Sequence, residues 1–201
     1  MDKKIIGIVG SYRKGKIIDT AVSAILKQSQ LAGAETNKIY LIDEKIAFCT
    51  NCRNCTQGKN DWPRSKCVFN DMEDILGQID DADGIVLGSP INFGNVTAVM
   101  KQFIERLLPY CYWPWGKALP GYRIKKANKK AIIITSSGCP EWLGRIIFAG
   151  ALRVMSSAVK CVGAKVVQSL YFGGIWRSQD QNLSDKQIAT VKKAVLKLPK
   201  F

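Results

Sequence analysis

Five short apolar segments alternate along the chain with longer segments that carry a helical period. The apolar segments span residues 3–9, 37–42, 84–88, 130–135 and 165–171. The third and fourth are almost continuously hydrophobic, which is typical of strands buried on both faces. The alternation therefore predicts five parallel strands with helices between them.

Between these segments, apolar side chains recur every three or four residues, as they do on one face of a helix. The stripes cover residues 22–32, 72–79, 96–108 and about 144–162. Gly33 is expected to end the first helix, because glycine readily adopts the left-handed conformation found there. A last helix is expected after Ser184, where Gln187 completes a capping box.

Two stretches, 46–70 and 109–127, fit no regular element. Long irregular segments inside a compact domain are usually functional. With 201 residues and no convincing linker, the chain is expected to form one domain over 1–201, with these two stretches as insertions.

Composition narrows the chemistry. The chain has no His, which excludes Ser-His or Cys-His nucleophilic machinery and His-ligated metals. The net charge is +14, but the cations are scattered, which favours a solvated surface and anionic cofactors over nucleic acid. No apolar run is long enough to span a membrane, and no signal-peptide cleavage site follows the first strand. We expect a cytoplasmic protein whose seven cysteines do not form a disulfide framework.

The loop after the first strand, residues 10–20, has hydroxyls, cations and glycines in front of a helix. This combination suits a phosphate group. The dinucleotide pattern G-x-G-x-x-G is absent, and the P-loop pattern fails because Ile17 stands where the Mg²⁺-binding hydroxyl is needed. A nucleotide hydrolase is therefore disfavoured, while an ordinary loop with exposed lysines remains an alternative.

The loop after the third strand combines a chain-directing proline with apolar and amide side chains. Ile91 and Phe93 offer apolar surface, and Asn92 can serve the polar edge of a ring. Gly94 lets the backbone approach a flat ligand closely. Asn95 is equally explained as the N-cap of the following helix.

Together, segments 10–15, 83–93 and 101–106 make the sequence resemble the flavodoxin-like NAD(P)H-dependent FMN reductases over nearly its whole length. The resemblance implies a flavodoxin-like three-layer α/β sandwich, with a five-stranded parallel sheet of order 2-1-3-4-5 and helices on both faces. It also implies FMN as cofactor, NAD(P)H as electron donor, and a homodimer or homotetramer with flavin sites near subunit boundaries.

The resemblance further implies which residues bind FMN. Its phosphate is assigned to the first loop, at Ser11, Arg13, Lys14, Asp19 and Thr20. The isoalloxazine ring is assigned to Pro90, Ile91, Asn92, Phe93 and Gly94. The loop after the fourth strand, with Ser136, Ser137, Gly138 and Cys139, is expected to close on the ring or ribityl side.

A cluster of four thiols lies in the first insertion. The spacing C-x₂-C-x₂-C, followed by a later cysteine, suits a [4Fe–4S] cube. It also resembles the iron–sulfur flavoproteins, with the candidate ligands Cys49, Cys52, Cys55 and Cys67. Free or redox-active thiols and a Zn²⁺ site are the alternatives. Cys111 and Cys161 are interpreted as buried small hydrophobes.

Residues 110–116 concentrate aromatic side chains in the second insertion. A core or dimer contact is one interpretation, and a lid or wall for a flavin is the other.

No catalytic side chain is expected, because a flavin carries out the redox chemistry itself. The leading hypothesis is an FMN-dependent oxidoreductase that transfers electrons from NAD(P)H to a quinone, a flavin or another acceptor. The second is an iron–sulfur flavoprotein that passes electrons between ferredoxin and FMN. The third is a basic nucleic-acid-associated protein that uses this fold without FMN.

Overall fold

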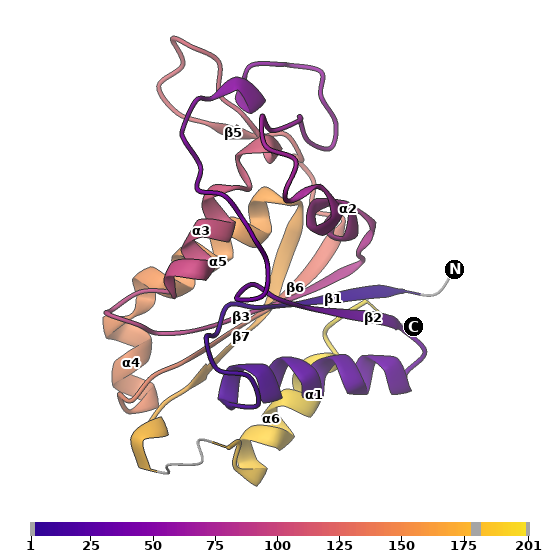
Figure 1. Cartoon of the computed structure of the whole chain (residues 1–201). Coiled ribbons are helices and arrows are strands. Elements are labelled where there is room, and N and C mark those ends of the chain that lie inside the picture. The colour runs from indigo at the N-terminus through magenta and orange to yellow at the C-terminus, as the bar shows by residue number, and fades with distance from the viewer. Residues whose placement is uncertain (1–2, 178–181, 200–201) are drawn as a thin grey trace.

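The five apolar segments form one parallel sheet of order β2-β1-β3-β6-β7 in the computed structural model, which describes residues 3–177 and 182–199 (Figure 1). Its strands are β1 (Lys4–Val9), β2 (Glu35–Tyr40), β3 (Gly84–Pro90), β6 (Lys129–Ser136) and β7 (Ala164–Phe172). All four strand pairs are parallel. Counted along the chain, the order is 2-1-3-4-5, which confirms the predicted fold.

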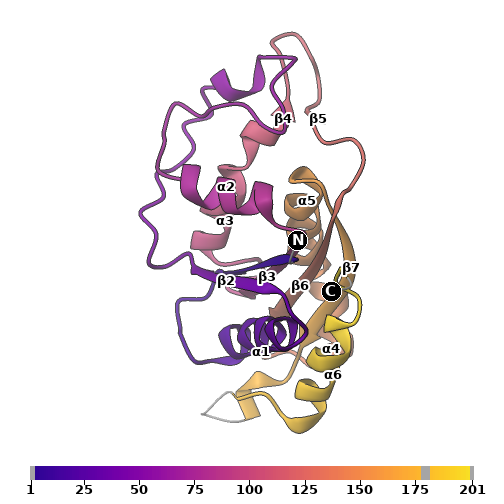
Figure 2. The same cartoon turned by 90° about the vertical axis from the view of Figure 1, so that its right-hand side faces the viewer.

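Helices cover both faces of the sheet, because side chains on each strand point alternately to opposite faces (Figure 2). Ile5 and Val9 pack in the core beneath α1 and α6, while Ile6 and Ile8 pack in the core on the other face. The helices are α1 (Ile17–Leu31), α2 (Glu73–Asp81), α3 (Ala98–Glu105), α4 (Glu141–Ile147), α5 (Ala149–Cys161) and α6 (Asp185–Val195).

Several predicted helix ends are confirmed. Gly33 follows α1 with φ +94, and Ser184 and Gln187 form the capping box of α6. The start of α3 differs from the prediction, because Thr97 rather than Asn95 is its N-cap and accepts a hydrogen bond from the Met100 amide.

Two helical stretches differ from the predicted spans. Helix α3 ends at Glu105, and the chain continues in a short 3₁₀ turn over Leu108–Tyr110. In a continuing α-helix, Pro109 would have no amide to donate to the Glu105 carbonyl, and its ring would clash with that carbonyl. The stretch predicted at 144–162 forms two helices that meet at Phe148 with a bend of 68°. Among the described residues, no single helix has the length and apolarity to cross a membrane; only this bent pair passes that test jointly.

The two insertions, 46–70 and 109–127, lie together at the top of Figure 1, beyond α2 and α3. They contain a 3₁₀ turn over Asn54–Thr56 and the short antiparallel pair β4 (Cys111–Tyr112) and β5 (Gly121–Tyr122). Backbone hydrogen bonds join them, from the Trp113 amide to the Thr56 carbonyl and from the Ser65 amide to the Pro109 carbonyl. Both views place the insertion pair on the side of the sheet away from α1 and α6.

Candidate functional site

Three loops meet where β1, β3 and β6 end, and we number them after their strands along the chain. Residues 10–16 form the first loop, 90–97 the third loop and 136–140 the fourth loop, and together we call them the carboxyl-edge loops. Ligands of open α/β sheets bind at this edge. Backbone hydrogen bonds extend the strand pairing into the loops: the Gly10 amide donates to the Gly88 carbonyl at 2.8 Å, and the Ile91 amide donates to the Ser136 carbonyl at 2.8 Å. The sheet therefore fixes where the three loops stand relative to one another.

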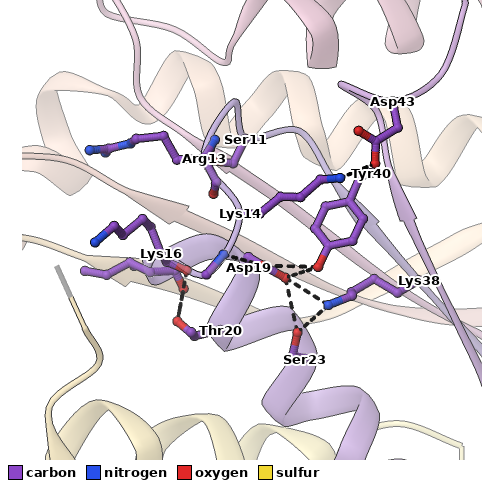
Figure 3. A network of polar contacts seen from close by, with 12 residues as sticks. Ser11, Arg13, Lys14, Lys16, Asp19, Thr20, Ser23, Lys38, Tyr40 and Asp43 are labelled. Atoms are coloured by element: carbon purple, nitrogen blue, oxygen red, sulfur yellow. Dashed lines mark hydrogen bonds and ion pairs between the residues drawn. The ribbon is translucent and has the colours of Figure 1, made fainter. Parts of the chain in front are cut away.

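The buried carboxylate of Asp19 organises the first loop (Figure 3). Its oxygens accept hydrogen bonds from the Gly15 amide at 2.6 Å, from Lys38 Nζ at 3.0 Å and from the Tyr40 hydroxyl at 3.0 and 3.1 Å. Ser23 Oγ donates to the same carboxylate at 3.2 Å. Asp19 thus joins the loop, α1 and β2.

Burial tends to raise the pKa of Asp19. The hydrogen bonds from the Gly15 amide, Lys38 and Tyr40 outweigh it, so the pKa lies below its ordinary value. Burial tends to lower the pKa of Lys38, but its contacts with Tyr40 and Asp19 outweigh burial and raise that pKa above its ordinary value. Both groups are therefore charged at neutral pH, and the loop is held by an ion pair.

These contacts revise the predicted phosphate site. The Asp19 carboxylate is negative and already bonded within the protein, so it supports the loop instead of facing an anion. The Thr20 hydroxyl donates to the Lys16 carbonyl inside α1, and Lys14 pairs with Asp43. Arg13 is exposed and has no ion pair within residues 3–177 and 182–199, so its guanidinium is open to a phosphate.

Tyr12 and Thr97, which the sequence reasoning missed, fasten the first loop to the third. Thr97 Oγ1 donates to the Gly10 carbonyl at 2.6 Å while capping α3, and the Tyr12 hydroxyl accepts from the Ala98 amide at 3.0 Å. The available signal for the cap was a threonine at the start of the helical stripe 96–108.

The third loop makes a tight turn in which the Asn92 and Asn95 backbones bond to each other at 2.8 and 3.1 Å. Phe93 has φ +46 and Gly94 has φ +81, and the Phe93 side chain is fully exposed. A bulky residue in the left-handed region is strained, and such strain gathers at ligand sites. The turn therefore presents an aromatic ring to the carboxyl edge.

Ser137 and Tyr171 support the fourth loop. The two hydroxyls lie 2.5 Å apart, and Ser137 Oγ also accepts from the Cys139 amide at 3.0 Å. Burial raises the pKa of Tyr171, so this hydroxyl stays protonated. A β-carbon on Gly144 would lie 2.0 Å from the Tyr171 oxygen, which explains a glycine in α4 at this position.

The four cysteines of the first insertion differ in environment. Cys55 is buried, Cys49 and Cys67 are half-buried, and Cys52 is exposed. Burial and, to a smaller extent, the nearby thiols of Cys67, Cys49 and Cys52 together raise the pKa of Cys55 to about 12. Within the described residues, no three His, Cys, Asp or Glu side chains are arranged to hold a metal ion. The thiols are thus neighbours without forming the predicted ligand set.

Three arginines hold the two insertions in place. Arg53 lies 3.8 Å from the Trp113 ring and 4.2 Å from the Trp115 ring. Arg106 donates to the Ala47 carbonyl at 2.8 Å, and Arg123 donates to the carbonyls of Cys55, Gly58 and Pro109. The aromatic insertion therefore packs on the cysteine insertion, and this placement does not support a lid over the chain's own first loop.

The remaining cysteines are partly as expected. Cys111 and Cys161 are both buried, which confirms the packing interpretation, and their sulfurs lie 3.5 Å apart. Cys139 is half-buried within the loop 136–140.

Sequence comparison finds one family match and several relatives. The family described as NADPH-dependent FMN reductase matches residues 3–172. An iron-sulfur flavoprotein of Archaeoglobus fulgidus is 31% identical over 161 residues, covering 78% of this chain and 67% of the relative. An iron-sulfur flavoprotein of Methanocaldococcus jannaschii is 36% identical over 107 residues, covering 53% of this chain and 52% of that relative. The chain thus spans only about half the length of this second relative.

Structure comparison supports the same fold. An NAD(P)H:quinone oxidoreductase from Methanothermobacter marburgensis superposes with a TM-score of 0.72 at 16% identity, covering 97% of this chain and 98% of the other.

Proposed function

The chain belongs to the NADPH-dependent FMN reductase family, and from that premise we propose that it binds FMN at the carboxyl-edge loops and passes electrons from NAD(P)H through it. The acceptor is a quinone, a flavin or another small oxidant. The observation that carries the proposal is the joining of three loops at one sheet edge, with an exposed guanidinium on the first and an exposed aromatic ring on the third.

The residues at this edge fit an FMN molecule in chemical terms. The first loop leads into α1, a 15-residue helix whose N-terminus favours an anion. The third loop supplies the Phe93 ring and the exposed Asn92 amide for a flat heterocycle. FMN, when bound, supplies the redox centre that accepts a hydride.

The chain's own residues bind and orient in this scheme. Arg13 and the amides near Ser11 hold the phosphate, while Asp19 keeps the loop in shape from behind. Ser137 and Tyr171 fix the fourth loop against the ring side. Hydride transfer from a nicotinamide to bound FMN would itself need no proton from a side chain, so we assign these residues binding and orienting roles only.

Anaerobic stopped-flow absorbance of the purified flavin-loaded protein tests this function. We expect NADH or NADPH to bleach the flavin band, and failure of both would contradict the proposal. Arg13→Ala should weaken FMN binding about 10-fold, the worth of one charge-assisted hydrogen bond. Arg153→Ala removes the same charge from an exposed position on α5 and should leave FMN binding unchanged.

A second candidate function is that of an iron–sulfur flavoprotein. It is favoured by the nearness of the other three thiols to Cys55, whose pKa they raise, and by relatives with that name. The arrangement in this structure does not fit a cluster, so we assign no electron-transfer step to one. Iron and acid-labile sulfide in an anaerobic preparation would establish the second function, and a flavin-only spectrum would remove it.

We also propose that two copies of the chain associate through α4. Trp142, Ile146 and Ile147 are exposed large apolar residues on this helix, and its charged residues, Glu141 and Arg145, pair with each other. Two strongly basic chains can therefore meet there without direct repulsion. Light scattering should give twice the chain mass, and Ile146→Asp should give the monomer.

The cytoplasm stays the predicted compartment.

A further inference from the structure

A cleft of about 300 Å³ lies between the two insertions, lined by residues from 59–62 and from 112–125. We call it the insertion cleft. It is separate from the carboxyl-edge loops, because no residue of 10–16, 90–97 or 136–140 lines it. Its lining is dominated by three lysines, one arginine and three aromatic side chains.

Two ammonium groups converge inside this cleft. Lys117 Nζ and Lys125 Nζ lie 3.5 and 3.6 Å from the point where a β-carbon on Gly121 would stand. Neither lysine has an ion pair within residues 3–177 and 182–199. Like charges on the same side of a cleft repel, so a ligand that carries negative charge is favoured between them.

The acidic residue of the cleft does not neutralise these lysines. Asp61 lies 3.8 Å from Arg123, whose guanidinium is buried and already bonded to backbone carbonyls. Asp61 and Arg123 therefore balance each other. The lysines remain as point charges on flexible stems, a form in which proteins commonly bind phosphate.

Aromatic rings stand beside the charges. Trp62 is 67% exposed and Tyr122 is 38% exposed. The Tyr112 ring lies 5.4 Å from Lys117 Nζ. Exposed rings next to paired cations are the combination on which nucleotide bases stack while their phosphates are neutralised.

We propose that the insertion cleft binds a nucleoside phosphate, with the phosphates at Lys117 and Lys125 above Gly121 and the base against Trp62 or Tyr122. The residues come from both insertions, so the site exists only while these two segments are packed together. The inference does not depend on flavin reduction, since no residue of the carboxyl-edge loops lines the cleft.

Titration of the flavin-loaded protein with ADP, followed by Trp fluorescence and calorimetry, tests the proposal. FMN is already bound in this preparation and does not compete. We expect ADP to bind more tightly than either inorganic phosphate or adenosine, and its affinity to fall with added salt. Equal binding of phosphate and ADP would overturn the assignment of the rings.

Matched variants locate the binding. Lys125→Ala should weaken ADP binding about 10-fold, as expected for one lost charge-assisted contact. Lys126→Ala removes the same charge from an exposed neighbour outside the cleft and should have no effect. Gly121→Val fills the point of convergence without changing the charge, and should also weaken ADP binding.

Two results would overturn the proposal. One is equal loss of affinity in the Lys125 and Lys126 variants, which would indicate a general effect of net charge. The other is binding of a single-stranded oligonucleotide without any binding of ADP, which would assign the surface to nucleic acid. A flavin absorbance spectrum and a thermal unfolding curve for each variant confirm that it is folded.

Discussion

The carboxyl-edge loops and the insertion pair are built on different principles. Backbone hydrogen bonds from Gly10 and Ile91 attach the loops to the sheet, and one buried acid, Asp19, shapes the first of them. The insertions have little regular structure and are held by arginine side chains, above all Arg123 and Arg53. Position is thus set by the fold at the first region and by a few long-range contacts at the second.

This difference predicts how the stability of each region responds to mutation. A loop that continues a strand is ordered whenever the sheet is folded. The insertions, held by arginine contacts and a few backbone hydrogen bonds to each other, can loosen while the sheet stays intact. Mutations should therefore separate the stability of the insertions from the binding of FMN.

The largest effect is expected for Arg123→Leu. This guanidinium is buried and donates to the carbonyls of Pro109, Gly58 and Cys55 at 2.9, 2.6 and 3.2 Å. Removing it leaves buried acceptors unsatisfied, so we expect a loss of about 3 kcal/mol in the free energy of unfolding. Urea denaturation measures this loss, and limited proteolysis should show faster cleavage within 46–70.

FMN affinity is the control for this variant. It should change less than about two-fold, because Arg123 lies outside the carboxyl-edge loops and a two-fold change is well under 1 kcal/mol. If FMN affinity fell in step with stability, the two regions would form one cooperative unit and the comparison would fail.

The next effect is expected for Asp19→Asn. The asparagine side chain carries no charge to pair with Lys38, and it has only one oxygen that can accept hydrogen bonds. We therefore expect a loss of about 2 kcal/mol in stability, together with weaker FMN binding. The pKa of Asp19 in the folded protein lies below its ordinary value of 3.8. The unfolded chain therefore takes up this proton first as the pH falls.

The stability that the Asp19 carboxylate contributes should be lost at low pH. The stability difference between wild type and Asp19→Asn should be constant above about pH 5 and should shrink as the pH falls below 3.8 through the lowered pKa. Denaturation curves at several pH values measure it. A difference that grew at low pH would mean that Asp19 is not the charged partner of Lys38.

How far the sequence could predict each region follows from the same contrast. The strand segments and the Ser184 cap could be predicted, because local periodicity and residue spacing are enough to indicate them. The support that Asp19 gives to the first loop could not be predicted, because its partners Lys38 and Tyr40 lie on β2, about 20 residues away from it along the chain. Arg53 between Trp113 and Trp115 depends on contacts about 60 residues apart, which no local pattern encodes.

A smaller effect is expected for Thr97→Val, which keeps the side-chain shape. The variant loses the 2.6 Å bond to the Gly10 carbonyl and the cap on α3, at a cost of about 1 to 2 kcal/mol. Ser184→Ala removes a similar cap from α6. Thermal unfolding should register both variants, but only Thr97→Val should weaken FMN binding. Equal FMN binding in both would show that Thr97 does not position the loops.

The smallest effect is expected for Tyr12→Phe. Its hydroxyl accepts one hydrogen bond from the Ala98 amide at 3.0 Å, and the side chain is 44% exposed, so water can replace the contact at a cost of about 0.5 kcal/mol. Since the bond joins the first loop to the third, FMN titration should still show a two- to three-fold weaker affinity, the equivalent of about 0.5 kcal/mol.

Tyr110→Phe is the comparison, because that hydroxyl bonds Asp80 at 2.6 Å on the insertion side. It should lower stability without changing FMN affinity. If the two tyrosine variants affected FMN equally, attachment to the sheet edge would not be what sets the flavin loops apart.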